Sequence, residues 1–154
     1  MVKIGGPIRS QASFRIMGDS LIPEKITELV GCEPTFAHRK GATARRPSGR
    51  EYVTRHGGWH LESEPRDSED LNGQITEILN QMTPDPAVWA ALAKEFRMDF
   101  FCGLFLRNYN QGLVLTPGLL SLLGNRGIEL SFDIYNNESD DDDVDGPKSS
   151  NHLH

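Results

Sequence analysis

The sequence predicts an α+β fold, a mainly antiparallel sheet covered by helices, and two patterns lead to this class. Alternating apolar and polar residues, typical of half-buried strands, occur at 11–18, 98–107 and 127–135. Between them lie segments with the spacing of amphipathic helices, most clearly at 67–82. A length of 154 residues is enough for one core. The order strand, helix, strands, two helices, strand, helix, strand suggests a ferredoxin-like plait with additions.

The first half of the chain predicts a strand, a helix and then two short strands. In the strand 11–18, apolar side chains alternate with polar ones. We expect Asp19 or Ser20 to cap the following helix and Gly31 to end it. Short strands are expected in EYVT and WHLES, with Trp59 facing the core.

The second half predicts three helices and two longer strands. Asp67 or Ser68 is expected to cap the helix in DSEDLNGQITEILNQM, and Asp85 the short helix after it. The strand 98–107 is apolar on both sides, which favours a central strand covered at least partly on both faces. The leucines of the helix after Thr116 are expected to face inward: Leu119, Leu120, Leu122 and Leu123. The last strand is expected to turn four apolar residues inward: Ile128, Leu130, Phe132 and Ile134.

Charge is distributed unevenly along the chain. The formal net charge is −6, but six acids lie within 138–145, and residues 1–137 carry 15 bases and 16 acids. Hydrophobic patterning ends with the last strand, so we expect a disordered acidic tail at 137–154. The predicted organisation is an N-terminal extension at 1–10, a single α+β domain at 11–136 and this tail.

Positive charge gathers in one Gly- and Pro-broken segment, residues 36–60, which holds six of the sixteen Lys and Arg residues and one acid. Three interpretations are open: a solvated loop whose arginines pair with acids elsewhere, a protein-binding surface, or a surface that binds nucleic acid or another anion. The near-neutral body argues against nucleic acid, so we favour a protein partner over it. The acidic tail could also fold back over this segment and shield it. Within 38–56 the expected contact residues are Arg39, Lys40, Arg45, Arg46, Arg50, Tyr52 and Arg55.

The sequence lacks the motifs of common catalytic sites. Neither a Gly-x-Ser-x-Gly elbow nor a Gly-rich phosphate loop ending in Lys-Ser/Thr occurs. His56 and His60 would point to one side of an extended segment, but a zinc site needs a third ligand, either Cys32 or His38. Asp99 and Asp133 lie on strands expected to be neighbours and could form a carboxylate pair. We therefore expect no enzyme, catalytic residue, metal or cofactor, and a metal-dependent hydrolase is the weaker alternative.

The sequence also predicts a cytoplasmic protein without a membrane segment. No apolar run approaches the roughly 20 residues that span a bilayer, and the N-terminus lacks the apolar core of a secretory signal. Cys32 and Cys102 are the only cysteines, too few for a disulfide framework. The oligomeric state is left open.

Three parts of the chain together resemble the bacterial domain of unknown function 4279 family over residues 11–135: the first strand with its helix, the KGATARR loop ahead of YVTRHGGWHLES, and the closing TPGLLSLLGNRGIELSFDIY. The resemblance implies an α+β sheet fold and carries no catalytic residues. Some relatives are thought to lie among toxin–immunity genes, which implies a binding role. We expect a small non-enzymatic protein-interaction module, immunity-like in its role, that uses the basic loop at 38–56.

Overall fold

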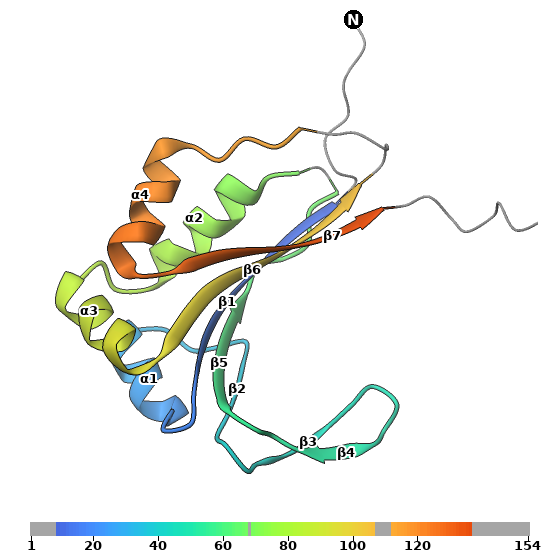
Figure 1. Cartoon of the computed structure of the whole chain (residues 1–154), viewed down its shortest axis with the longest axis vertical. Coiled ribbons are helices and arrows are strands. Elements are labelled where there is room, and N and C mark those ends of the chain that lie inside the picture. The colour runs from blue at the N-terminus through green and yellow to red at the C-terminus, as the bar shows by residue number, and fades with distance from the viewer. Residues whose placement is uncertain (1–8, 68, 107–111, 137–154) are drawn as a thin grey trace, which may run out of the picture.

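Strands with alternating apolar residues build a five-stranded sheet, and amphipathic helices pack on one of its faces (Figure 1). The computed structural model describes residues 9–67, 69–106 and 112–136. The strands of these segments are β1 (Arg9–Gly18), β2 (Phe36–His38), β3 (Thr43–Arg45), β4 (Glu51–Val53), β5 (Gly57–Glu62), β6 (Arg97–Leu106) and β7 (Glu129–Asn136). The helices are α1 (Pro23–Val30), α2 (Leu71–Gln81), α3 (Pro86–Glu95) and α4 (Pro117–Arg126). The predicted α+β class is confirmed.

The strand order of the main sheet is β2-β5-β1-β6-β7, and β3 and β4 form a separate two-stranded sheet. All neighbours in the main sheet are antiparallel except β6 and β7, which are parallel and joined through α4. A split βαβ unit would have a further strand between its two parallel strands. Here the parallel strands are direct neighbours, so the ferredoxin-like arrangement is not confirmed.

The core lies between the sheet and the helices. Phe14 of β1 is at its centre, with ring centroids 5.3 Å from Phe100, 5.9 Å from Trp89 and 6.2 Å from Trp59. Trp59 is fully buried, as predicted. Its indole N–H donates to the Thr27 hydroxyl at 3.1 Å, so burial leaves no polar group of this ring unpaired.

The ends of two helices differ from the predictions. The residue at the N-cap of α1 is Ile22, without a side-chain cap, and the predicted caps Asp19 and Ser20 are wrong. Gly31 does end this helix, with a left-handed φ of 84°. Asp70, rather than Asp67, caps α2 by accepting from the Gly73 amide at 3.2 Å. The predicted cap of α3, Asp85, is confirmed.

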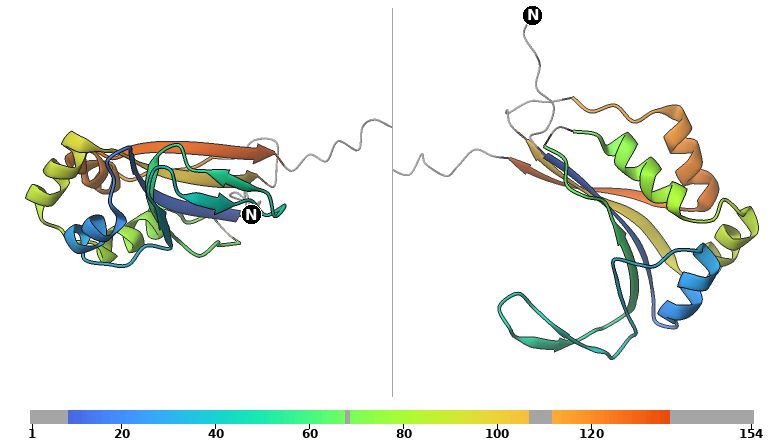
Figure 2. Two further views of the ribbon diagram at one scale, coloured as in Figure 1. Left: turned by 90° about the horizontal axis from the view of Figure 1, so that it is seen from below. Right: turned by 180° about the vertical axis from the view of Figure 1, so that it is seen from behind.

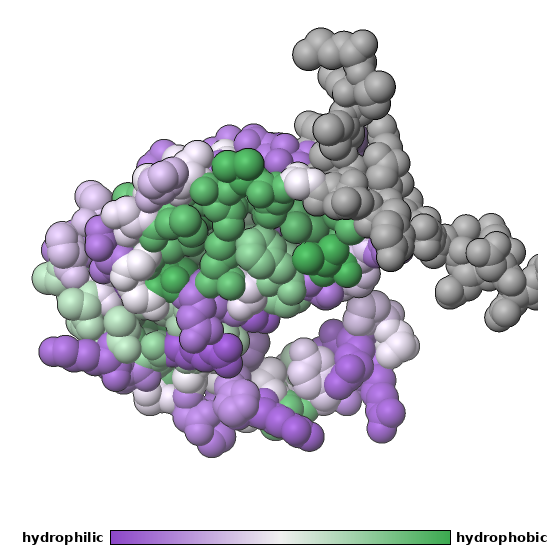
Figure 3. All heavy atoms as spheres, turned by 45° about the horizontal axis from the view of Figure 1, so that its top comes forward, coloured by the Kyte–Doolittle hydropathy of each residue, from purple (hydrophilic) through white to green (hydrophobic). Residues whose placement is uncertain are grey.

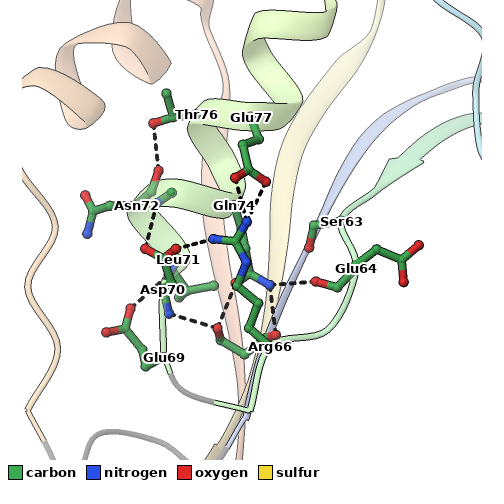
Figure 4. A network of polar contacts seen from close by, with 12 residues as sticks. Ser63, Glu64, Arg66, Glu69, Asp70, Leu71, Asn72, Gln74, Thr76 and Glu77 are labelled. Atoms are coloured by element: carbon green, nitrogen blue, oxygen red, sulfur yellow. Dashed lines mark hydrogen bonds and ion pairs between the residues drawn. The ribbon is translucent and has the colours of Figure 1, made fainter.

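A polar network fixes the start of β1 against α2 (Figure 4). Ser10 and Gln74 are fully buried, and the Ser10 hydroxyl donates to Gln74 Oε1 at 2.7 Å. The Gln74 amide donates to the carbonyls of Ser10 at 3.0 Å and Glu64 at 2.9 Å. On the solvent side, the guanidinium of Arg66 lies between Asp70 and Glu77. The buried polar groups are therefore satisfied, which is the condition for burying them at low cost.

The helices cover the end of the sheet at β7 only in part. Four apolar residues predicted to face the core are exposed instead: Leu120, Leu122, Phe132 and Ile134. Phe132 and Ile134 do lie on the helix side of β7, but α4 packs near the beginning of that strand. Apolar side chains consequently gather on the surface in this region (Figure 3).

Three predictions fall on residues outside the described segments. They are the N-terminal extension before Arg9, the candidate helix cap Ser68 and the acidic tail at 137–154. Strand β1 begins two residues before the predicted boundary, so positions 9 and 10 belong to the sheet. None of the described helices is long and apolar enough to cross a membrane.

Candidate functional site: a basic arm and an open sheet face

The basic segment forms a hairpin that stands away from the sheet on the side opposite the helices (Figures 1 and 2). We call residues 39–56 the basic arm. Its two strands, β3 and β4, pair in antiparallel register over three residues each. The turn between them is closed by the Arg46 amide, which donates to the Arg50 carbonyl at 2.9 Å. In the space-filling view the arm is mainly hydrophilic and open space separates it from the body (Figure 3).

Thr54 fixes the base of the basic arm. It is the one buried residue between positions 39 and 56. Its hydroxyl donates to the Arg39 carbonyl at 2.6 Å and accepts from the Ala42 amide at 3.0 Å. The Gly41 amide donates to the Thr54 carbonyl at 2.8 Å. The two ends of the arm are thereby joined by hydrogen bonds, although the arm itself covers almost no core.

Three of the six cations in the basic arm pair with carboxylates. Arg39 lies 3.0 Å from Glu24, Lys40 lies 3.0 Å from Asp19, and Arg45 lies 2.9 Å from Glu51 within the hairpin. All three pairs are exposed, so each contributes little to stability. For these residues, pairing with acids of the body or the loop agrees with the interpretation as a solvated loop.

The other three cations have no carboxylate partner among the described residues: Arg46, Arg50 and Arg55. The Arg46 guanidinium lies over the ring of Tyr52, 5.0 Å from its centroid. Tyr52 is 41% exposed, and its neighbour Val53 is 63% exposed. The outer part of the arm therefore combines unpaired positive charge with accessible aromatic and aliphatic surface.

The sheet face opposite the helices is open and is organised in cross-strand rows. One row joins Phe36, His60, Arg15 and Asp99, and the next joins Glu62, Ser13 and Phe101. The third joins Gln11, Gly103 and Asp133, and the fourth joins Arg9, Phe105 and Tyr135. The prediction of a central strand covered at least partly on both faces agrees with β6: it lies between β1 and β7, and on this second side Asp99 is buried and Phe101, Gly103 and Phe105 are half-buried.

A buried ion pair lies in the first row. Arg15 Nε donates to Asp99 Oδ1 at 2.8 Å and Arg15 Nη2 donates to Oδ2 at 2.6 Å, a bidentate contact. Asp99 is fully buried, and this hydrogen bonding raises the pKa of Arg15. The guanidinium also stacks on Phe101, 4.6 Å from the ring centroid. Both charges are therefore held in place, and together they are neutral.

His60 stays uncharged near neutral pH. Its ring stacks on Phe36 with centroids 4.1 Å apart. Burial, together with His38 and Arg15 nearby, lowers the pKa of His60 to about 4, although Asp99 acts in the opposite direction. The stack of two uncharged rings forms one side of the open face.

The open face contains a hollow of about 370 Å³ that sequence reasoning did not predict. Its lining comes from all five strands of the main sheet: Gln11, Ser13, Arg15, Phe36, His60, Glu62, Phe101, Gly103, Phe105 and Tyr135. A usable signal was present in the sequence. Phe101 and Phe105 flank a glycine on the second side of the strand 98–107, an arrangement that fits an exposed aromatic surface as well as a covered one.

The two candidate catalytic arrangements are not assembled. His56 binds Asp19 at 2.9 Å, whereas His60 stacks on Phe36. In the described segments, no group of three or more His, Cys, Asp or Glu side chains is placed to hold a metal ion. Asp99 and Asp133 do lie on neighbouring strands, but the register places Asp99 beside Glu129, four residues from Asp133.

The comparisons with known proteins identify the family. The family model described as "Domain of unknown function (DUF4279)" matches residues 7–137. The chain therefore belongs to this family, as the sequence motifs predicted. No curated protein and no solved structure matches the chain.

Proposed function

We propose that this protein is a non-enzymatic binding protein whose basic arm contacts an acidic surface of a protein partner. The observation that supports this most strongly is the projecting hairpin itself. Ordering each residue costs about 1–2 kcal/mol of conformational entropy, and an isolated two-stranded hairpin is at best marginally stable. The arm buries only Thr54, so it adds little to the core in return. A contact surface is the role that accounts for such an element.

The chemistry of the outer arm matches a protein interface. Arg46, Arg50 and Arg55 offer positive charge without an internal carboxylate partner, which favours rapid encounter with an acidic partner. Tyr52 and Val53 offer contact area, and tyrosine and arginine are common among the residues that dominate interface energies. We infer that these five residues form the contact, while carboxylates already occupy Arg39, Lys40 and Arg45.

Nucleic acid is the less favoured partner. A nucleic-acid site neutralises many phosphates, and only three cations of the arm are free of carboxylates. Asp19, Glu24 and Glu51 lie beside the other three and would repel a phosphate backbone. The two unpaired cysteines, Cys32 and Cys102, fit a reducing compartment, so we place the interaction in the cytoplasm.

Affinity capture with matched charge variants tests this proposal. The baits are the wild type, Arg50→Glu/Arg55→Glu in the arm, and Lys25→Glu/Lys94→Glu on α1 and α3. The two variants carry the same change of charge, and none of the four side chains forms an ion pair in the described structure. We expect a protein at near-equal molar amounts with the wild type and the lysine variant, retained after nuclease treatment and lost with the arginine variant. Equal retention by both variants, or loss on nuclease treatment, would contradict the proposal.

A further inference from the structure

The hollow on the open face lies between two ridges of larger side chains. Phe36, His60 and Arg15 form the first ridge, and the stacked rings of Phe105 and Tyr135, 4.8 Å apart, form the second. The two rows are six positions apart along β1, from Arg15 to Arg9, which is about 20 Å. The floor between them carries polar residues, Gly103 and the ring of Phe101. The volume of the hollow, about 370 Å³, lies within the range of ligand pockets.

Gly103 keeps the floor of this hollow open. A Cβ atom at Gly57 would lie 2.7 Å from the Gly18 carbonyl oxygen, so packing requires glycine there. At Gly103 a Cβ atom would meet only Phe105, at an ordinary 3.7 Å, and φ lies outside the left-handed region. Glycine inside a strand weakens it and often marks the close approach of a ligand. Because neither packing nor backbone conformation requires it here, Gly103 points to an occupant of the hollow.

The polar groups of the hollow select an uncharged occupant that can both accept and donate a hydrogen bond. Arg15 Nη1 has no acceptor among the described residues and lies on a guanidinium whose other side is fixed by Asp99. A carboxylate ligand would add a second negative charge beside buried Asp99, which disfavours it. Glu62 lines the same hollow and can accept a hydrogen bond. Aromatic side chains on both sides suit a flat ring.

We infer that this hollow binds the ring of a tyrosine side chain presented by the protein that contacts the basic arm. The ring lies over Gly103, and its hydroxyl accepts from Arg15 and donates to Glu62. One partner can contact the hollow and the basic arm at the same time, because Phe36 of the first ridge is on β2, the strand that leads directly into the arm. This inference rests on the proposed function and adds to it the residue type that the partner inserts.

The test uses N-acetyltyrosinamide as a probe, with backbone amide NMR of the full chain as the readout. We expect saturable shifts at Ser13 and Gly103, with a dissociation constant of about 1 mM or weaker, as befits a single side chain. Gly103→Val places a β-branched residue in the hollow at a position where a strand tolerates it. This variant should lose the shifts. Met17→Val, on the same sheet face but outside the lining, should keep them.

Three further probes define what would overturn the inference. N-acetylphenylalaninamide should bind about fivefold more weakly because it lacks the hydroxyl. N-acetylaspartamide and uridine should bind more weakly than the tyrosine probe. No shifts in the hollow, shifts that persist in Gly103→Val, or equal or tighter binding of any comparator would overturn it. Because the tyrosine probe does not need Arg50 or Arg55, failure here leaves the arm proposal standing, and failure of the capture experiment leaves this result unchanged.

Discussion

Replacing Arg15 by leucine tests the account of the open face through the buried Asp99. The side chain of Asp99 is 1% exposed and would keep only a 3.4 Å hydrogen bond from the Ser131 hydroxyl. Removing one partner of a buried pair costs about 3–5 kcal/mol. Arg15 is 28% exposed, so we expect the lower end, about 3 kcal/mol. For a chain of this size that lowers Tm by about 6–12 °C.

Urea denaturation of a double-mutant cycle at pH 7 measures this loss. Asp99→Leu should cost less than Arg15→Leu, because the guanidinium left behind can reach solvent. The double variant should be more stable than Arg15→Leu, with a coupling of about 2 kcal/mol or more. If Arg15→Leu stays within about 1 kcal/mol of the wild type at pH 7, or if the two changes simply add, the reasoning about this pair is wrong.

Three further predictions concern other buried groups. The pKa of His60 is lowered to about 4, so the stability that its uncharged form contributes is fully present above pH 6.5 and is lost as pH falls toward 4. Between pH 7 and pH 5, urea titration should therefore show that His60→Gln loses about 1 kcal/mol less unfolding free energy than the wild type, a figure that allows for the partial exposure of the ring. Gln74→Leu removes the acceptor of the buried Ser10 hydroxyl and one donor to the Glu64 carbonyl, and should cost about 1–3 kcal/mol in the same assay, whereas a cost near zero would refute the role of this network. Burial raises the pKa of Cys102 to about 12, so a thiol reagent at pH 8 should modify Cys32 in the folded protein and reach Cys102 only on unfolding; rapid modification of both would contradict the burial.

Local sequence patterns predicted which helices and strands form better than they predicted where these elements end or which of their faces are covered by other elements. The alternation of β1 and the helical spacing of α2 are each set by the face that packs on the core, and both were identified. Asp19 was expected to cap α1, but its carboxylate accepts from Lys40 and His56. These partners are 21 and 37 residues away, so no local pattern indicates them.

Alternation shows which side chains share a face, but not whether another element covers that face. Phe132 and Ile134 share the helix side of β7, as predicted, and yet are 39% and 58% exposed. The leucines of α4 occupy so much of the helix that spacing alone does not separate Leu119, which is buried, from Leu120, which is not.

The two parts of the candidate site also differ in whether the sequence predicted them. The basic arm was predicted because its charge is contiguous in sequence. The hollow was missed because it needs the register of five strands, which brings Ser13, Phe36 and Gly103 together. Pairing of strands that are distant in sequence depends on the whole fold, and a single sequence carries little information about it.

Photo-crosslinking in living cells tests the central claim, that the basic arm contacts a protein, most directly. A benzophenone amino acid replaces Tyr52 in the arm or, as the control, Ala91 on the exposed side of α3. We expect one discrete crosslinked protein from position 52, absent from position 91 and absent from position 52 when Arg50 and Arg55 are also changed to glutamate. Crosslinks to nucleic acid alone, or the same products from both positions, would contradict it.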